Sequence, residues 1–291
     1  MKHAILGAGA IGGLVGAKLA ALGEDVIVIV RPDRLAGYPD RLTLERPAGT
    51  MTAPASAVAK LTAPVDVLWI ATKTFQLASA LEAVAVTPRM VIPLLNGTEH
   101  MNFLRERFGA KHVFAGTIAI EAERAAPGHF VQRGQVARLN LIGTAEPVLG
   151  ALMTRMNDAG FSTQFIASEA TLLWSKLCFL GPFALVTSAS GKNKSEVFVD
   201  PLWKERVVAA VNEACAVARA EGAEVEAAKI HAFMENAPPM MRSSMQKDVE
   251  AGRPLELDAI GGAIVRAAEK HGMEVPVTRE LITLIEAKKA A

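Results

Sequence analysis

The chain has 291 residues, of which 51% are hydrophobic and 21% charged, and its formal net charge is +1. This length and apolar content allow two domains with packed cores, and the small net charge gives no overall bias toward nucleic acid or an anionic membrane. No apolar run approaches the roughly 20 residues that span a bilayer, and the N-terminal MKHAILGAGAIGG is no signal peptide. We therefore expect a cytoplasmic protein with no nucleic-acid or membrane partner.

Four short segments of the first half read as buried strands, and a helix follows the first of them. The strands are His3–Leu6, Asp25–Val30, Val65–Ala71 and Met90–Leu95, and the helix is Ile11–Leu22. Continuous apolar runs that alternate with helices are typical of a parallel, doubly wound α/β sheet. The sequence therefore predicts a Rossmann-type first domain.

The rest of the chain changes character twice. Gly128–Gly143 contains turn glycines and alternating residues, which predict an antiparallel hairpin that completes the sheet. Beyond Ile166 the patterns are helical. The segments expected to form helices are Ser168–Leu180, Asp200–Glu221, Ala228–Asn236, Ser243–Ala251, Glu256–His271 and Pro276–Lys289. We expect a dinucleotide-binding domain over residues 1–166 and an all-α domain over 167–291, with a cleft between them.

The first predicted helix opens with a glycine motif, Gly7-Ala8-Gly9-Ala10-Ile11-Gly12, which fits GxGxxG. In this context Gly7 permits a tight turn, Gly9 lets a pyrophosphate approach the backbone, and Gly12 lets the helix lie close to the strand. The helix N-terminus offers unpaired N–H groups to the phosphates. We therefore predict that these six residues bind a dinucleotide.

The residue after the second predicted strand indicates which dinucleotide. An acidic side chain there would bind the ribose hydroxyl of NAD, whereas Arg31 suits the additional phosphate of NADP. Arg34 lies nearby, and Asp33 lies beyond a proline. The sequence favours NADP, although Arg31 also fits a solvated loop charge.

Three further polar residues lie where chemistry is expected. Lys73 and Asn96 follow predicted strands, at the sheet edge where α/β proteins bind ligands, and Asn96-Gly97 is also an ordinary turn. Lys176 lies in the apolar stretch TLLWSKLCFL, where a lysine either extends to the surface or is desolvated in a cleft. The two cysteines, Cys178 and Cys215, form no CxxC pair. We expect both to be buried in the core, where a cysteine packs like a small hydrophobic residue.

Taken together, these motifs resemble those of the ketopantoate reductase (2-dehydropantoate 2-reductase) family along nearly the whole chain. The shared features are the glycine loop, Arg31, Thr72-Lys73, Asn96-Gly97, WSKL around Lys176, and the run SSMQKDVEAGRPLELD over 243–258. The resemblance implies a Rossmann domain followed by a helical domain, NADPH as cofactor, and reduction of 2-dehydropantoate to pantoate in pantothenate and coenzyme A biosynthesis.

The resemblance also implies roles for individual residues. Lys176 matches the catalytic lysine that donates a proton, and Glu256 matches the acidic residue beside it. Ser244 matches a serine that contacts the substrate. Asn96 and Lys73 match residues near the nicotinamide and the cofactor ribose, with Asn96 also near the substrate, and Ala122 matches a backbone contact to the cofactor.

One position departs from the family pattern, which usually has Asn four residues after the lysine, where this chain has Leu180. Asn193 or Ser190 would have to supply the hydrogen bonds that the family's asparagine makes. Reduction of another small 2-keto acid is therefore an alternative, and a non-catalytic NADP sensor is a second one. The chemistry requires no metal, and we see no metal-binding pattern. We expect a homodimer, the commonest oligomer.

Overall fold

The computed structural model describes residues 1–290, and their side chains except those of residues 135, 136, 289 and 290. It contains two compact units. One comprises Met1–Leu95 and His100–Ala167, and the other comprises Asn96–Glu99 and the chain from Ser168 onward. The predicted limits, 1–166 and 167–291, assigned Asn96–Glu99 to the first domain, whereas the structure groups this segment with the second unit.

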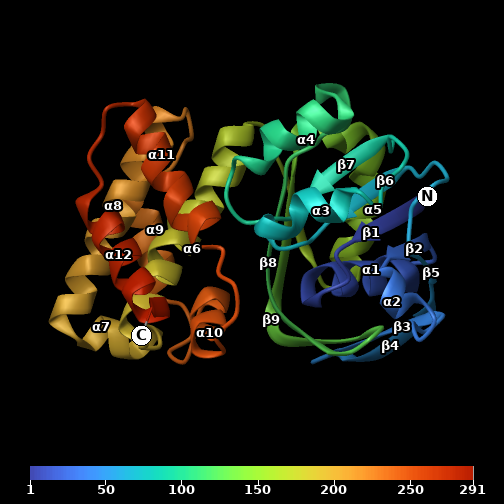
Figure 1. Ribbon diagram of the computed structural model, residues 1–291, viewed down its shortest axis with the longest axis horizontal. Coiled ribbons are helices and arrows are strands. Elements are labelled where there is room, and N and C mark those ends of the chain that lie inside the picture. The colour runs from blue at the N-terminus through green and yellow to red at the C-terminus, as the bar shows by residue number, and fades with distance from the viewer. Residues whose placement is uncertain (291) are drawn as a thin grey trace. The chain divides into compact units, whose positions relative to one another are not determined.

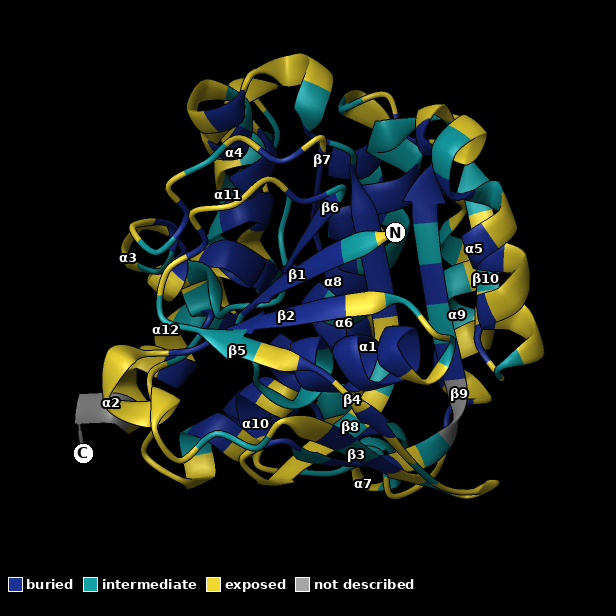
Figure 2. Ribbon diagram, turned by 90° about the vertical axis from the view of Figure 1, so that its right-hand side faces the viewer, coloured by how far each residue is buried: buried dark blue, intermediate teal, exposed yellow. Residues whose placement is uncertain are grey.

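The first unit, blue to green in Figure 1, is built around a parallel sheet. Its strands have the order β5-β2-β1-β6-β7, and all four neighbouring pairs are parallel. Their bounds are β1 Lys2–Leu6, β2 Asp25–Ile29, β5 Ser56–Val58, β6 Val67–Ile70 and β7 Met90–Pro93. Most of β1 and β2 is buried, as the dark blue ribbons of Figure 2 show. The predicted α/β fold with a Rossmann-type sheet is confirmed.

The described residues of the first unit also form five α-helices. Their bounds are α1 Ala10–Ala21, α2 Pro32–Leu35, α3 Leu77–Leu81, α4 His100–Phe108 and α5 Glu146–Asp158. Of these, α1 was predicted from the sequence. The others were not predicted. Helices α2 and α3 have only four and five residues, whereas the buried Leu149, Leu152, Met153 and Met156 of α5 follow a helical period that could have identified it.

A second sheet holds the segment that was predicted to be a hairpin. Its strand order is β10-β9-β3-β4, and β8 pairs with β9. The bounds are β3 Arg41–Arg46, β4 Gly49–Pro54, β8 Gly116–Ala126, β9 His129–Ile142 and β10 Ser162–Ile166. The prediction of a hairpin within Gly128–Gly143 was therefore wrong. That segment is one long strand, its antiparallel partner is β8, and the turn lies at Gly128, whose φ is +70°.

The second unit is helical, yellow to red in Figure 1. Its helices are α6 Glu169–Ser190, α7 Lys194–Val199, α8 Pro201–Ala220, α9 Ala227–Glu235, α10 Ser244–Glu250, α11 Ala263–Lys270 and α12 Pro276–Ala290, with a π-helical segment at Asp258–Gly262. Asp200 caps α8 by accepting hydrogen bonds from the backbone N–H groups of Leu202 and Trp203, as its position before Pro201 predicted.

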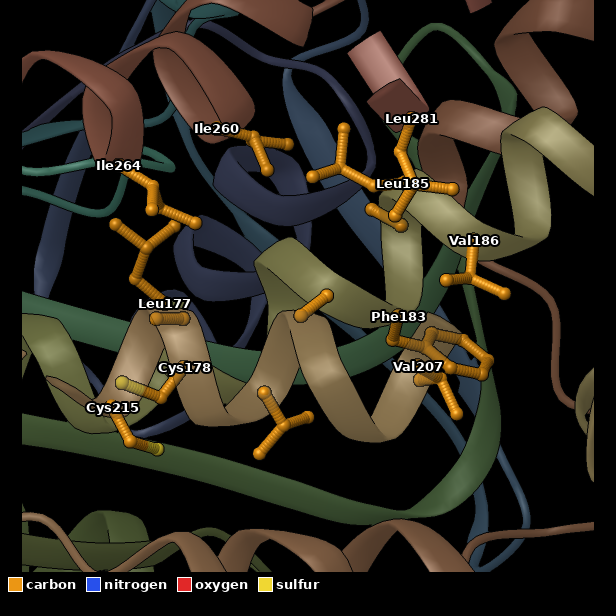
Figure 3. Close-up of a cluster of buried hydrophobic side chains, with 14 of the residues drawn as sticks. Leu177, Cys178, Phe183, Leu185, Val186, Val207, Cys215, Ile260, Ile264 and Leu281 are labelled. Carbon is orange, nitrogen blue, oxygen red and sulfur yellow. The ribbon is translucent and has the colours of Figure 1, made fainter. Parts of the chain in front are cut away.

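Helix α6 is longer than the sequence predicted. It continues through Pro182 to Ser190, although proline removes one helical hydrogen bond. Tertiary packing explains the continuation, because Phe183, Leu185 and Val186 are buried in the core of the unit (Figure 3). Burial of these side chains outweighs the local stop signal of Gly181-Pro182.

The expectation that no apolar run approaches bilayer length was wrong for this helix. By length and composition alone, the 22 residues of α6 could cross a membrane. In the structure, 67% of the most apolar 18-residue stretch of this helix is buried within the protein. Its apolar character is therefore that of a core helix. Cys178 and Cys215 belong to the same core, where both are free thiols with no exposed surface, as predicted. A hydrogen bond with Cys215, together with burial, raises the pKa of the Cys178 thiol.

Candidate active site

The glycine loop has the geometry that its sequence predicted. Gly7 has a φ of +95°, and a Cβ there would lie 2.7 Å from the backbone nitrogen of Thr72. A Cβ on Gly12 would lie 2.2 Å from the carbonyl oxygen of Gly7. Around Gly9, by contrast, a Cβ would meet no atom within 4 Å. Two glycines are therefore needed for packing, and the third leaves open space at the N-terminus of α1.

This open space fits the diphosphate of a dinucleotide. Gly9 is the N-cap of α1 and offers no side chain to bond the first N–H groups of the helix, so these groups remain available to an anion. Ala8, Ala10 and Ile11 are all partly exposed around the turn. A phosphate could therefore reach the backbone here.

The arginine after β2 is exposed. Arg31 precedes the short helix α2, and its side chain keeps 73% of its surface exposed. Its Nε lies 3.7 Å from a carboxylate oxygen of Asp33, and Arg34 also bonds Asp33. Because Asp33 follows a proline, the sequence indicated no role for it at the end of β2. In the structure, α2 brings its carboxylate next to both Arg31 and Arg34. A ligand phosphate would compete with this carboxylate for Arg31.

Beyond β6, Thr72 lies next to the glycine loop, and Lys73 follows it in the chain. Lys73 precedes a short 3-10 turn, Thr74–Gln76. Before it, the buried hydroxyl of Thr72 has no hydrogen-bond partner among the described residues, while the Thr72 nitrogen adjoins Gly7. A buried hydroxyl without a partner is costly, so this atom suits a ligand contact. The sequence singled out Thr72 only as part of a shared motif.

Ala122 lies elsewhere in this unit. It belongs to β8, directly after a register shift, and pairs with Gln132 of β9. It is therefore on the second sheet and not on the parallel sheet that carries the glycine loop.

The helical unit brings together three of the predicted site residues. The amide nitrogen of Asn96 donates to Glu256 Oε2 over 3.1 Å, and the charge of Glu256 acts on Lys176 of α6. Glu256 is only 6% exposed. Although part of Lys176 remains exposed, burial of its ammonium lowers its pKa to about 8, and Glu256 partly opposes that decrease. An amine of this kind can hold or release a proton near neutral pH.

Ser244 is placed differently from these three residues. It is exposed, as the first residue of α10. The buried Ser243 before it caps the helix by accepting from the N–H of Gln246, and its hydroxyl is 2.8 Å from that of Thr187. Ser-x-x-Gln is a known capping pattern that could have identified Ser243 from the sequence.

The structure gives Ser190 and Asn193 local roles. The Ser190 hydroxyl donates to the carbonyl of Val186 and accepts from the N–H of Lys192. Asn193 forms a reciprocal capping box with Glu196 at the start of α7. The Ser190 hydroxyl and the Asn193 Oδ1 atom are therefore engaged locally, while among the described residues the Asn193 amide nitrogen contacts only Met240 Sδ, over 3.8 Å. Leu180 itself is partly buried, one helical turn after Lys176.

Within the described residues, no group of three or more His, Cys, Asp or Glu side chains could hold a metal ion.

Comparisons with known proteins agree with this arrangement. Residues 3–142 match the family model described as "Ketopantoate reductase PanE/ApbA", and residues 170–289 match "Ketopantoate reductase PanE/ApbA C terminal". A relative from Caulobacter vibrioides named 2-dehydropantoate 2-reductase is 30% identical over 98% of each chain. A relative of that name from Halobacterium salinarum is 29% identical, also over 98% of each.

Solved structures show the same fold. A PanE/ApbA family ketopantoate reductase from Ralstonia eutropha has a TM-score of 0.86 at 27% identity, covering 100% of this chain and 99% of its own. The ternary structure of D-mandelate dehydrogenase with NADH and anilino(oxo)acetate has a TM-score of 0.87 at 23% identity, covering 100% and 98%.

The fold and the matches define a Rossmann-type oxidoreductase that uses a nicotinamide cofactor. The chain belongs to the ketopantoate reductase family, whose members act on the CH–OH group of a 2-hydroxy acid or reduce the matching keto acid.

Proposed function

We propose that this protein reduces 2-dehydropantoate to pantoate with NADPH, a step toward pantothenate and coenzyme A. The observation that carries the proposal is the cluster of Asn96, Glu256 and Lys176, which supplies an amine with a pKa of about 8 beside a carboxylate. The names of the curated relatives support this substrate.

In this proposal the first unit holds the cofactor. Gly7, Ala8, Gly9, Ala10, Ile11 and Gly12 would bind the diphosphate. Arg31 would bind the additional phosphate of NADPH, and Lys73 and Ala122 would contact the rest of the cofactor, as would Asn96 of the helical unit. Bound NADPH supplies a hydride to the keto carbon of the substrate.

The second unit supplies the proton. As the carbonyl oxygen gains negative charge, the Lys176 ammonium stabilises it and then donates a proton to it, which completes the alcohol. Glu256 orients the ammonium, and Asn96 fixes Glu256 through the 3.1 Å hydrogen bond. Ser244, exposed at the start of α10, would bind the substrate carboxylate.

A second substrate class is favoured by Leu180. An apolar side chain one turn after Lys176 cannot pair with a substrate hydroxyl, and each unpaired group would cost about 1–3 kcal/mol. Since Ser190 and Asn193 are already bonded locally, a 2-keto acid without a hydroxyl is the alternative substrate.

The test is to mix the purified protein with NADPH and a panel of 2-keto acids, with and without hydroxyl groups, and to follow the absorbance of the reduced cofactor. We expect the fastest loss with 2-dehydropantoate. Faster loss with an unhydroxylated acid would transfer the assignment to the alternative, and a flat trace for every acid would refute both. We further propose that the enzyme is a cytoplasmic homodimer. Light scattering would test its oligomeric state.

A further inference from the structure

A four-residue segment of the first half of the chain, Asn96–Glu99, belongs to the helical unit. Its backbone lies directly against the π-helical segment, because a Cβ on Gly97 would be 2.3 Å from the carbonyl oxygen of Ala259. Gly97 also has a φ of +79°, which disfavours any other residue there. The segment carries Asn96 to its hydrogen bond with Glu256.

The Arg266 side chain binds both Asn96–Glu99 and the π-helical segment. The Nε and Nη2 atoms of Arg266 donate to the two carboxylate oxygens of Glu99, over 2.7 and 2.6 Å. Its Nη1 donates to Asp258 Oδ1 over 2.6 Å, and Nη2 also reaches the Asp258 carbonyl over 3.1 Å. Arg266 therefore joins the end of the segment to the start of the π-helical segment.

The helix leaves room for this guanidinium. A Cβ on Gly262 would lie 2.7 Å from Asp258 Oδ1 and 2.9 Å from Arg266 Nη1. Any larger residue at position 262 would displace the pair. Local deviations of the π type often occur at functional sites, and this one begins two residues after Glu256. The Glu256 carbonyl accepts from the N–H of Ile260, inside the π-helical segment, over 3.0 Å.

We propose that Arg266 is a positioning residue of the reductase, which clamps Asn96–Glu99 onto the π-helical segment and so holds Asn96 against Glu256. The inference rests on the proposed function, because it assigns Glu256 to the reacting site. Arg266 touches no reacting atom itself and acts through Glu99 and Asp258.

An isolated ion pair at the surface would not carry this role. Arg266, Glu99 and Asp258 keep 42%, 52% and 84% of their side-chain surface exposed, and single exposed pairs contribute little to stability. Here, however, one planar group binds a carboxylate through two parallel bonds and a second carboxylate as well, which fixes geometry as well as charge. The expected effect is therefore on the position of Asn96 and less on stability.

The experiment compares Arg266→Met, Arg266→Lys and Glu99→Gln in steady-state kinetics, NADPH titration and amide hydrogen exchange. We expect Arg266→Met to lower kcat/KM for the keto acid about tenfold, since small displacements in a site have large effects. Lysine keeps the positive charge but cannot form the two parallel hydrogen bonds of the guanidinium. The kcat/KM of Arg266→Lys should therefore lie between those of Arg266→Met and the wild type. The double variant Arg266→Met/Glu99→Gln should match Arg266→Met within about twofold, because both act on one contact.

Arg279→Met is the matched control. Arg279 forms an ion pair with Glu269 over 2.7 Å in the same unit, with similar side-chain exposure of 45%, but it does not contact Asn96–Glu99. We expect this control variant to keep both the wild-type kcat/KM and the wild-type NADPH affinity. The inference is overturned if Arg266→Met keeps wild-type kcat/KM, or if Arg279→Met loses as much.

Hydrogen exchange separates this inference from the proposed function. Loss of the clamp should speed exchange in a peptide that contains residues 96–99, whatever the substrate is. If the wild type reduces no 2-keto acid while Arg266→Met still speeds that exchange, the proposed function fails and the clamp stands. If the wild type is active and exchange at 96–99 is unchanged in Arg266→Met, the clamp fails alone.

Discussion

The two units prepare their functional groups in different ways. In the parallel-sheet unit the glycine loop is six consecutive residues, and its geometry depends on side chains that are absent: a Cβ would clash at Gly7 and Gly12 and would fill open space at Gly9. In the helical unit the important groups are long polar side chains from distant parts of the chain, since Asn96 and Glu256 are 160 residues apart. One arrangement is local, and the other exists only when the chain has folded.

This difference predicts that catalysis and cofactor binding can be lost separately. For Lys176→Met, we expect kcat for keto-acid reduction to fall about 10³-fold, the range for loss of a positioned proton donor. The NADPH dissociation constant, measured by fluorescence titration, should stay within about twofold of wild type. Lys229→Met is the control, because Lys229 is an exposed lysine of the same unit, paired with Glu226. A variant at Lys176 with a near-normal rate would remove the proposed proton donor.

The complementary change is Gly9→Val in the first unit. Because no protein atom lies within 4 Å of a Cβ at this position, we expect the thermal midpoint to be nearly unchanged. The added side chain would occupy the space proposed for the diphosphate, and NADPH should bind on the order of 100-fold more weakly, as for the loss of about 3 kcal/mol.

Gly12→Val is the comparison for that experiment, since its Cβ would be 2.2 Å from the Gly7 carbonyl oxygen and should destabilise the fold. If Gly9→Val kept wild-type affinity for NADPH, the glycine loop would not be the diphosphate site.

A smaller effect is expected at Arg31, which would decide between the two nicotinamide cofactors. Arg31→Ala should weaken NADPH about tenfold through the loss of a charge-assisted contact, and leave NADH unchanged. Competition from Asp33, 3.7 Å away, makes this effect modest. Equal weakening of both cofactors, seen in paired titrations, would show that Arg31 does not recognise the additional phosphate.

The same contrast explains what the sequence could predict. The glycine loop, the buried parallel strands and the Asp200-Pro201 helix start are local patterns, and each was recognisable from neighbouring residues alone. The length of α6 was not, because tertiary burial carried the helix through Pro182. The β8–β9 hairpin is local, since the two strands join at Gly128, but its position was predicted wrongly: Gly128 is the turn, and the residues after it form one strand.

Long-range contacts limited the prediction of the site in the same way. Lys176, Glu256 and Asn96 could be chosen through a family resemblance, but their mutual contact could not be derived from spacing. Glu99 and Arg266 carry no local signal, since an exposed glutamate in a loop and an arginine in a helix are ordinary residues. Only the folded helical unit brings them together, 167 residues apart in the chain.

The central claim is that Lys176, as an ammonium, gives its proton to the carbonyl oxygen, and its pH dependence tests this most directly. The pKa of Lys176 is lowered to about 8 by burial, and the protonated form is the active one. The kcat/KM for keto-acid reduction at saturating NADPH should therefore be level below about pH 8 and fall as the pH rises above it. A decline that begins only near the ordinary lysine value of about 10.4, or a rate that rises through pH 8, would contradict the account.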